Sequence, residues 1–231
     1  MFCHAHPDDE ALLTAGTMAK AVEHGHRVVL VVATDGAAGL TSQSRATQLA
    51  NERRAEVTRS AEILGVHDLV LLDYPDSGFE GSRPDSFVTL QPQDIADRLH
   101  VIASEVGADI LIGYDPAGGY GHPDHRHLHR SLRLAALAIN LERQSQLFEA
   151  TLPREAIRWG ARLAKSLGLA PAAFDPTEFD DKWTPRSQIT NRVGVHRYLR
   201  AKRAAQAAHS SQKESDGGQR TLAVLSRQIG R

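Results

Sequence analysis

The stretch that decides the fold is RVVLVVAT at residues 27–34, a short run rich in β-branched side chains that ends at the turn pair Asp35-Gly36. An apolar run of this length, closed by a turn, is typical of a strand buried on both faces of a parallel sheet. Residues 68–73 (DLVLLD) and 109–113 (DILIG) show the same pattern. The sequence therefore predicts three buried strands of one mostly parallel sheet.

Segments of helical character separate these strands. They lie at residues 10–24, 45–64 and 92–106. Strands that alternate with helices at this spacing indicate βαβ units, with helices on both faces of the sheet. We therefore predict an α/β protein with a Rossmann-like, mostly parallel sheet flanked by helices.

The second half of the chain is less regular. We expect helices at residues 154–167 and 198–209 and a further strand at residues 189–195. No internal repeat and no domain linker is recognisable in the sequence. We predict that residues 1–231 form one domain. Residues 1–140 form its α/β core, and residues 141–231 form a smaller C-terminal lobe and tail.

The composition excludes several classes of protein. With 27 Lys plus Arg against 28 Asp plus Glu, the net charge is -1, so there is no field of one sign to attract nucleic acid or an anionic membrane. The apolar runs are too short to cross a bilayer, and the amino terminus lacks the pattern of a signal peptide. The single cysteine, Cys3, excludes disulfide scaffolds and thiolate zinc fingers. We expect a cytoplasmic protein.

Two polar motifs, each with a His-Pro-Asp triplet, follow expected strands. HAHPDDE occupies residues 4–10 and GGYGHPDH occupies residues 118–125, in a chain with twelve histidines. Ligands of open α/β sheets bind outside the carboxyl ends of the strands, where both motifs should lie. Proline suits the first turn of a helix, so Pro7 and Pro123 are each expected to begin one.

The residue types in these motifs suit a metal ion. His6 and Asp9 are three residues apart and can converge across a turn, while His122 and His125 lie one helical turn apart. Imidazole and carboxylate are zinc ligands, and a catalytic zinc typically keeps three protein ligands and a water. Asp8 and His122 are then left beside the metal as candidate acid/base groups. One Zn²⁺ per chain is expected, with Fe²⁺ or Co²⁺ as alternatives.

Other histidines and the cysteine are expected to have structural roles. A single histidine near a helix start is usually a cap or a surface residue. That interpretation applies to His24, His26, His67, His100, His127 and His129. Cys3 is expected to pack as a small apolar side chain.

The motif residues resemble the PIG-L/LmbE-like family of zinc-dependent deacetylases. AHPDDE at residues 5–10 and HPDH at residues 122–125 are similar to the family's two signatures. Asp76-Ser77-Gly78 resembles a family loop, and residues 189–212 resemble its C-terminal strand and helix, which end in His-x-Ser-Gln. The GGYGHPDH form is most similar to the branch that handles mycothiol and its precursor. The strand before AHPDDE is shorter here than is usual in the family.

The resemblance implies a role for several motif residues. It implies that His6, Asp9 and His125 bind zinc, and that Asp8 is the general base that activates the zinc-bound water. His122 would donate a proton or stabilise the oxyanion, and Asp124 would orient it.

The resemblance also implies a substrate class. Tyr120 would help to polarise the substrate carbonyl, and Arg53 and Asp76 would contact the substrate. The reaction would be hydrolysis of a linear C–N amide bond, removing the N-acetyl group from a small N-acetylamino sugar (an N-acetylglucosaminide) or a related amide conjugate.

Three other functions agree less well with the sequence. A mononucleotide-binding module is excluded because Gly36-Ala37-Ala38-Gly39 lacks the G-x-G-x-x-G pattern and no Walker A motif is present. A metal-dependent phosphoesterase shares the His/Asp ligands but often needs two metals. A catalytically inactive sugar-binding homologue is disfavoured by the presence of Asp8, His122 and Asp124.

Overall fold

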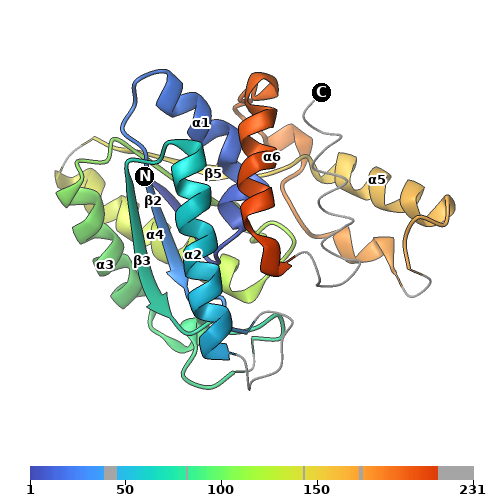
Figure 1. Ribbon diagram of the computed structural model, residues 1–231, viewed down its shortest axis with the longest axis horizontal. Coiled ribbons are helices and arrows are strands. Elements are labelled where there is room, and N and C mark those ends of the chain that lie inside the picture. Colours follow the sequence, from blue (N-terminus) through green and yellow to red (C-terminus); the bar gives the residue numbers. More distant parts are fainter. Residues whose placement is uncertain (39–45, 82, 143, 172–173, 213–231) are drawn as a thin grey trace.

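The computed structural model has one five-stranded parallel sheet with helices on both faces (Figure 1). It describes residues 1–38, 46–81, 83–142, 144–171 and 174–212, so the tail at residues 213–231 lies outside the described residues. The strands are β1 (Phe2–His4), β2 (Val29–Thr34), β3 (Asp68–Tyr74), β4 (Ile110–Tyr114) and β5 (Gln146–Ala150).

The strand order is β3-β2-β1-β4-β5, and every neighbouring pair is parallel. From the central β1 the chain builds β2 and β3 on one side and β4 and β5 on the other. The order therefore reverses between β1 and β4, and this switch point is where ligands bind in doubly wound sheets. The predicted Rossmann-like class is confirmed, and the described sheet is wholly rather than mostly parallel.

Helices cover both faces of the sheet, close to the bounds that the sequence predicts. One face carries the π-helical turn η1 (Glu10–Thr14), α1 (Ala15–Glu23), α2 (Ala46–Leu64) and α6 (Leu199–Ala208). The other face carries α3 (Pro92–Glu105) and α4 (Pro123–Glu142). In Figure 1, α5 (Arg154–Ser166) projects away from the sheet. Short 3₁₀ turns are η3 (Phe87–Thr89), η4 (Pro176–Phe179), η5 (Arg186–Gln188), η6 (His196–Tyr198) and η7 (Ser210–Gln212).

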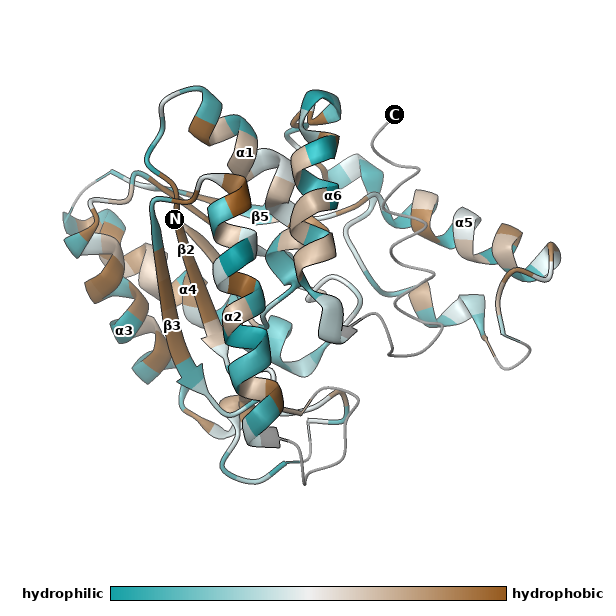
Figure 2. Ribbon diagram, viewed as in Figure 1, coloured by the Kyte–Doolittle hydropathy of each residue, from teal (hydrophilic) through white to brown (hydrophobic). Residues whose placement is uncertain are grey.

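β2 shows why its sequence forms a central strand. All six of its residues are buried, and successive side chains point to opposite faces. Val29 and Val31 join the core under α3 and α4, whereas Leu30 and Val32 join the core under α1, α2 and α6. Figure 2 accordingly shows the strands as hydrophobic, while α2 is largely hydrophilic. Burial stabilises each such side chain by about 1.5–3 kcal/mol.

The strand predicted at residues 189–195 is wrong. β5, which the sequence analysis did not predict, occupies the edge beside β4. The segment instead packs across α1: Val195 lies so close to Gly16 that a Cβ there would be 2.7 Å from the Val195 Cβ.

Two expected surface histidines are buried. His127 and His129 lie on the side of α4 that faces the sheet and η3, with exposures of 7% and 8%. The ring of His127 packs edge-on against Phe87, and His129 Nδ1 donates to the carbonyl oxygen of Tyr114. Cys3 is buried, as expected, whereas His24, His26 and His67 are exposed. No described helix has the length and apolar character needed to cross a membrane.

Candidate metal and catalytic site

The two His-Pro-Asp motifs meet at the switch point of the sheet. The first follows β1 and the second follows β4. Pro123 begins α4 as predicted, but Pro7 does not begin a helix. Pro7 and Asp8 form a turn, and η1 begins at Glu10. This turn aims the side chains of His6 and Asp9 back toward the second motif.

Three side-chain atoms form a tight triangle at this point. His6 Nδ1 lies 3.2 Å from Asp9 Oδ2, and His125 Nε2 lies 3.1 Å from the same oxygen. The two nitrogens are 3.2 Å apart. All three residues are buried, with exposures of 6%, 4% and 1% for His6, Asp9 and His125. Residues 119 positions apart in the chain thus present nitrogen and oxygen atoms to one corner.

Hydrogen bonds on the far side of each ring determine which atoms hold lone pairs. The Gly118 carbonyl oxygen accepts from His125 Nδ1 at 3.1 Å, and Asp124 Oδ2 accepts from His6 Nε2 at 3.0 Å. In the neutral rings, His125 Nε2 and His6 Nδ1 are therefore acceptors that face the Asp9 carboxylate. Ligands of a tetrahedral zinc at 2.0–2.1 Å lie about 3.3 Å from one another, close to these separations. Three acceptors at one corner suit a cation.

Two other groups of three side chains, one of histidines alone and one of a histidine with two aspartates, also have candidate ligand atoms within 4.8 Å of one another. They are His6 with His122 and His125, and His6 with Asp76 and Asp124. The nitrogen of His6 that faces Asp76 and Asp124 carries a proton for them, so these carboxylates act as hydrogen-bond acceptors for the ring. This is the usual outer partner of a metal-binding histidine. The triangle with Asp9 is therefore a better cation site than the group with Asp76 and Asp124.

The charges in the triangle shift both of its titrating partners. Burial alone would lower the pKa of His6, but the carboxylates of Asp76, Asp124 and Asp9 raise it well above the usual value. Burial alone would raise the pKa of Asp9, but His125 and His6 lower it well below the usual value. Without a metal ion, the chain thus holds a proton among these groups. A divalent cation would take its place, because zinc binds neutral imidazole.

Asp8 stands beside the triangle in a strained backbone conformation. Its φ is 127°, in the region that favours glycine, and its N–H donates to Glu10 Oε2 at 2.9 Å. Burial, followed by the negative charge of Asp9, raises the pKa of Asp8 to about 7. Strain of this kind costs about 1–3 kcal/mol and persists where surrounding contacts hold it, commonly at functional sites.

His122 presents one protonated nitrogen to the site. The backbone N–H of Asp124 donates to His122 Nδ1 at 3.2 Å, so the neutral ring carries its proton on Nε2. Burial, then the charges of His6 and His125, lower the pKa of His122 to about 3. The ring is 4.4 Å from that of His6, centroid to centroid. A neutral His122 is therefore a hydrogen-bond donor beside the triangle.

The expected partner of Asp124 needs correction. Its carboxylate accepts from His6 Nε2 and, at 3.1 Å, from the Ser77 N–H, whereas the bond from Asp124 to His122 comes from its backbone. Asp124 is in the first turn of α4, and its fully buried side chain points across to the first motif. Asp124 was expected to orient the His122 ring, but its carboxylate instead orients the His6 ring.

The three predicted substrate-side residues also gather here. The Tyr120 ring lies 4.9 Å from His125, and Asp76 Oδ1 lies 3.5 Å from His6 Nε2. Arg53 is buried at 4% exposure, and its Nε has no hydrogen-bond partner among the described residues. Its guanidinium passes directly under Gly36, where a Cβ would lie 2.3 Å from Nη1. All nine predicted residues thus lie in or beside one buried cluster.

Several functional neighbours were missed by the sequence analysis. Tyr114 donates its hydroxyl proton to Asp9 Oδ2 at 2.6 Å and stacks on the His125 ring at 4.0 Å. Its position at the carboxyl end of β4 was the available signal. Glu10 belongs to the first motif and His209 begins the His-x-Ser-Gln motif, but the sequence assigned neither residue a role. They form a buried pair, with His209 Nε2 2.7 Å from Glu10 Oε1.

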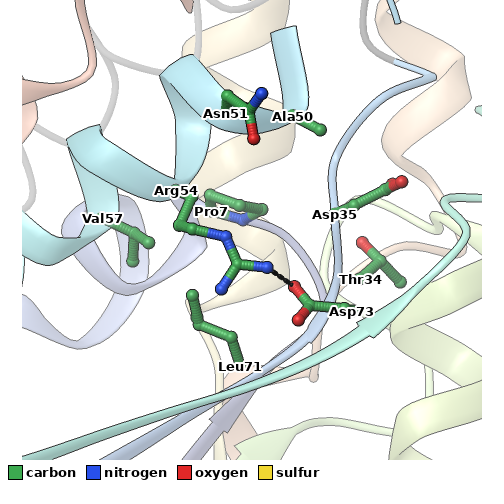
Figure 3. Close-up of a pocket in the computed structure, with 9 residues that line it drawn as sticks. All are labelled: Pro7, Thr34, Asp35, Ala50, Asn51, Arg54, Val57, Leu71 and Asp73. Atoms are coloured by element: carbon green, nitrogen blue, oxygen red, sulfur yellow. Dashed lines mark hydrogen bonds and ion pairs between the residues drawn. The ribbon is translucent and has the colours of Figure 1, made fainter. Parts of the chain in front are cut away.

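A small pocket beside the first motif is separate from this cluster. It lies between α2 and the ends of β2 and β3, and Arg54 reaches across it to Asp73 at 2.5 Å (Figure 3). Pro7 lines it, but none of the nine predicted site residues does. The ion pair is half exposed, and such pairs contribute about 0–1 kcal/mol. The pocket therefore has no evident part in the chemistry.

Fold and site together define an α/β protein with a candidate His/Asp metal site at the switch point of its sheet. A family model described as PIG-L, GlcNAc-PI de-N-acetylase, matches residues 1–136. The chain belongs to the PIG-L family, as its motifs predicted.

The alignments with named relatives cover most of the chain. It is 32% identical over 238 residues to 1D-myo-inositol 2-acetamido-2-deoxy-alpha-D-glucopyranoside deacetylase of Thermobifida fusca, covering 92% of this chain and 82% of the relative. The protein of the same name from Actinosynnema mirum is 34% identical over 232 residues, covering 92% and 80%. The structure of N,N'-diacetylchitobiose deacetylase from Pyrococcus horikoshii matches with a TM-score of 0.61 at 25% identity, over 97% of this chain and 74% of that chain.

The strain at Asp8 can be measured with a pair of variants. Asp8→Gly and Asp8→Ala both remove the carboxylate, but glycine adopts a φ of 127° freely and alanine does not. We expect Asp8→Gly to have the higher Tm when both proteins are measured metal-free in chelator. Asp97→Gly and Asp97→Ala in α3 are the control, where alanine should be the more stable by about 1 kcal/mol. Equal Tm values for the two Asp8 variants would contradict the strain.

Proposed function

We propose that the protein is a metal-dependent amidase that removes the N-acetyl group from a small N-acetylglucosaminide. The observation that carries this proposal is the corner where His6 Nδ1, Asp9 Oδ2 and His125 Nε2 converge, with Asp8 beside it. Membership of a de-N-acetylase family and the names of the relatives support the same reaction.

His6, Asp9 and His125 are the proposed metal ligands, and Zn²⁺ is the proposed ion, with Fe²⁺ and Co²⁺ as alternatives. When bound, such an ion lowers the pKa of its water toward 7 and polarises a carbonyl oxygen. The carboxylates of Asp124 and Asp76 next to His6 Nε2 support this role, because they orient the ring and raise its basicity.

The chain's own residues then divide the proton transfers. Asp8 takes a proton from the attacking water as general base and returns it to the departing amine nitrogen, so that acetate and a free amine result. His122 donates a hydrogen bond from Nε2 to the substrate oxygen as negative charge develops there, an effect worth about 2.7–4 kcal/mol for one donor. Tyr120 assists at the same oxygen. The protonation of His122 on Nε2 supports its role as the oxyanion donor.

The amino-sugar substrate is supported by the polar groups around the corner. The Arg53 Nε–H has no partner in the part of the chain that the structure describes, and Asp76 carries a carboxylate; both groups can bond to sugar hydroxyls. A site that hydrogen-bonds a hydroxyl strongly rejects analogues that lack it. The relatives are named for an acetamido sugar joined to myo-inositol, which supports a small glucosaminide. We expect this enzyme to act in the cytoplasm and to have no nucleic-acid or membrane partner.

The ligand assignment predicts different metal contents for two histidine variants. His125→Ala should lose most of the bound metal because one corner of the triangle is gone. His122→Ala should keep about one ion per chain. Elemental analysis of both proteins, purified alongside the unchanged chain, makes the measurement. Stoichiometric metal in His125→Ala would show that His125 is not a ligand.

The adjacent carboxylates should respond differently to loss of charge. Asp8→Asn should retain the metal yet lower kcat by about 10²–10⁴-fold, the usual contribution of a general base. Asp9→Asn should weaken metal binding itself. Acetate release and metal content are measured on the same samples. If metal-loaded Asp8→Asn turns over at the unchanged rate, Asp8 is not the base.

The substrate proposal is tested with a panel of acetylated amines. We expect acetate release from N-acetylglucosaminides and none from acetyl-lysine peptides. Arg53→Ala and Asp76→Ala should lower kcat/KM more than they lower metal content. Arg54→Ala is the matched control, because the neighbouring arginine pairs with Asp73 away from the cluster and should leave KM unchanged. Release from acetyl-lysine peptides alone would overturn the amino-sugar assignment.

A further inference from the structure

Two buried ionisable residues near the proposed base have no part in the chemistry described so far. Glu10 is the last residue of the first motif, and His209 lies directly after α6, 199 positions later in the chain. Glu10 is fully buried and His209 is 3% exposed. His209 Nε2 lies 2.7 Å from Glu10 Oε1, so the two side chains share a hydrogen bond inside the protein. Neither side chain contacts the triangle of His6, Asp9 and His125 among the described contacts.

The other oxygen of Glu10 reaches the strained residue. Glu10 Oε2 accepts the backbone N–H of Asp8 at 2.9 Å. The φ of Asp8 is 127°, so its N–H and the chain that follows it have a relative orientation that residues with negative φ do not adopt. The Asp8 carbonyl oxygen accepts from the N–H groups of Ala11 and Leu12, which begins the following helix. The Glu10 carboxylate is therefore the contact that holds the amide side of Asp8.

Glu10 is itself held from two separate elements. Ser60 Oγ of α2 donates to Glu10 Oε1 at 2.6 Å, and His209 reaches the same oxygen from the end of α6. The segment after His209 is fastened to α2 as well. Glu56 accepts from Ser210 Oγ at 2.9 Å and from the N–H and Oγ of Ser211, each at 2.7 Å. The C-terminal segment thus reaches the first motif through charged and hydroxyl groups.

We propose that Glu10 and His209 are positioning residues, which hold the strained backbone of Asp8 so that its carboxylate stays in place for proton transfer. In this arrangement the end of α6 completes the active site without touching the substrate. The inference rests on the proposed function for its effect on turnover, but its effect on the Asp8 backbone is independent of any activity.

The proposal separates turnover from metal binding for a physical reason. Without His209, the buried Glu10 carboxylate loses one of its hydrogen-bond partners, which is costly inside the protein, and the side chain moves toward water. Asp8 then loses its acceptor and relaxes from the strained conformation. Asp9 keeps its contacts with the His6 N–H at 2.9 Å and with Tyr114, so the metal corner remains. A displacement of about 1 Å in a catalytic group can cost 10²-fold in rate.

The test uses His209→Ala, with His209→Gln as the variant that can still donate a hydrogen bond to Glu10. His100→Ala is the matched control, since His100 also pairs with a glutamate, Glu142, at 3.0 Å but far from the site. Each full-length protein is loaded with Zn²⁺ and assayed for metal content, for kcat and KM on an N-acetylglucosaminide, and for Tm. Crystal structures of metal-loaded His209→Ala and His209→Gln give the φ of Asp8.

We expect His209→Ala to keep its metal and its KM, to lose about 10–100-fold in kcat as for other orienting partners, and to show Asp8 at negative φ. His209→Gln should recover most of the kcat and the positive φ, and His100→Ala should match the unchanged protein.

If Asp8 keeps its φ near 127° in His209→Ala, or if φ changes while kcat does not, the positioning role is wrong. Absence of acetate release from the unchanged chain would instead overturn the proposed function, and the φ values would still decide the role of His209. Should His209→Ala fail to fold, Ser60→Ala removes the other support of Glu10 and is judged by the same φ and kcat.

Discussion

The parallel pairing of β1 on both of its sides is the constraint on which the structure depends. β1 has three residues, and Phe2 pairs with Leu30 of β2 on one side and with Ile112 of β4 on the other. This register brings the carboxyl ends of β1 and β4 to the same edge of the sheet. The chain connections leave in opposite directions from these two strands, so the loops after them face each other across the switch point. The two His-Pro-Asp motifs lie in the segments of chain that follow these two strands.

The cluster at this edge concentrates buried charge, which opposes folding unless each group has partners. Asp9 accepts from the His6 N–H and the Tyr114 hydroxyl, and Asp124 accepts from His6 and the Ser77 N–H. The remaining need is at the corner, where two imidazole lone pairs face a carboxylate when both rings are neutral. In the proposed metal-bound state a cation meets that need, which couples metal binding to stability.

The C-terminal part of the chain is joined to this site through the core as well as through polar contacts. α6 packs beside α1 and α2, and Ala205 is fully buried in the same core as Met18 and Val57. This packing brings His209 to Glu10 and η7 to Glu56. The division into a 1–140 core and a 141–231 lobe therefore describes the sequence pattern, while the folded chain places residues from both parts around the first motif.

Local sequence was enough to identify the strands at residues 27–34, 68–73 and 109–113, because each is a short, continuous apolar run. Of these three, only β2 is buried throughout, as predicted, whereas β3 lies at the edge of the sheet and is only partly buried. It was also enough to place the two motifs at strand ends and to select His6, Asp9, His125 and Asp8, since those residue types and spacings are local properties. The strand β5 was missed because its sequence, Gln146–Ala150, lacks a comparable apolar run. Residues 189–195 pair with no strand of the described sheet.

The sequence by itself thus determined the α/β class, the bounds of five helical segments within a few residues, the first residue of α4 and the chemical character of the site. Tertiary structure alone decided which groups meet across long separations. The Asp124 carboxylate bonds to His6 rather than to its near neighbour His122, and Tyr114 and His209 reach the first motif from distant elements. Spacing along the chain limits contacts within one turn or strand, but contacts between elements depend on sheet order and helix packing, which no local pattern specifies.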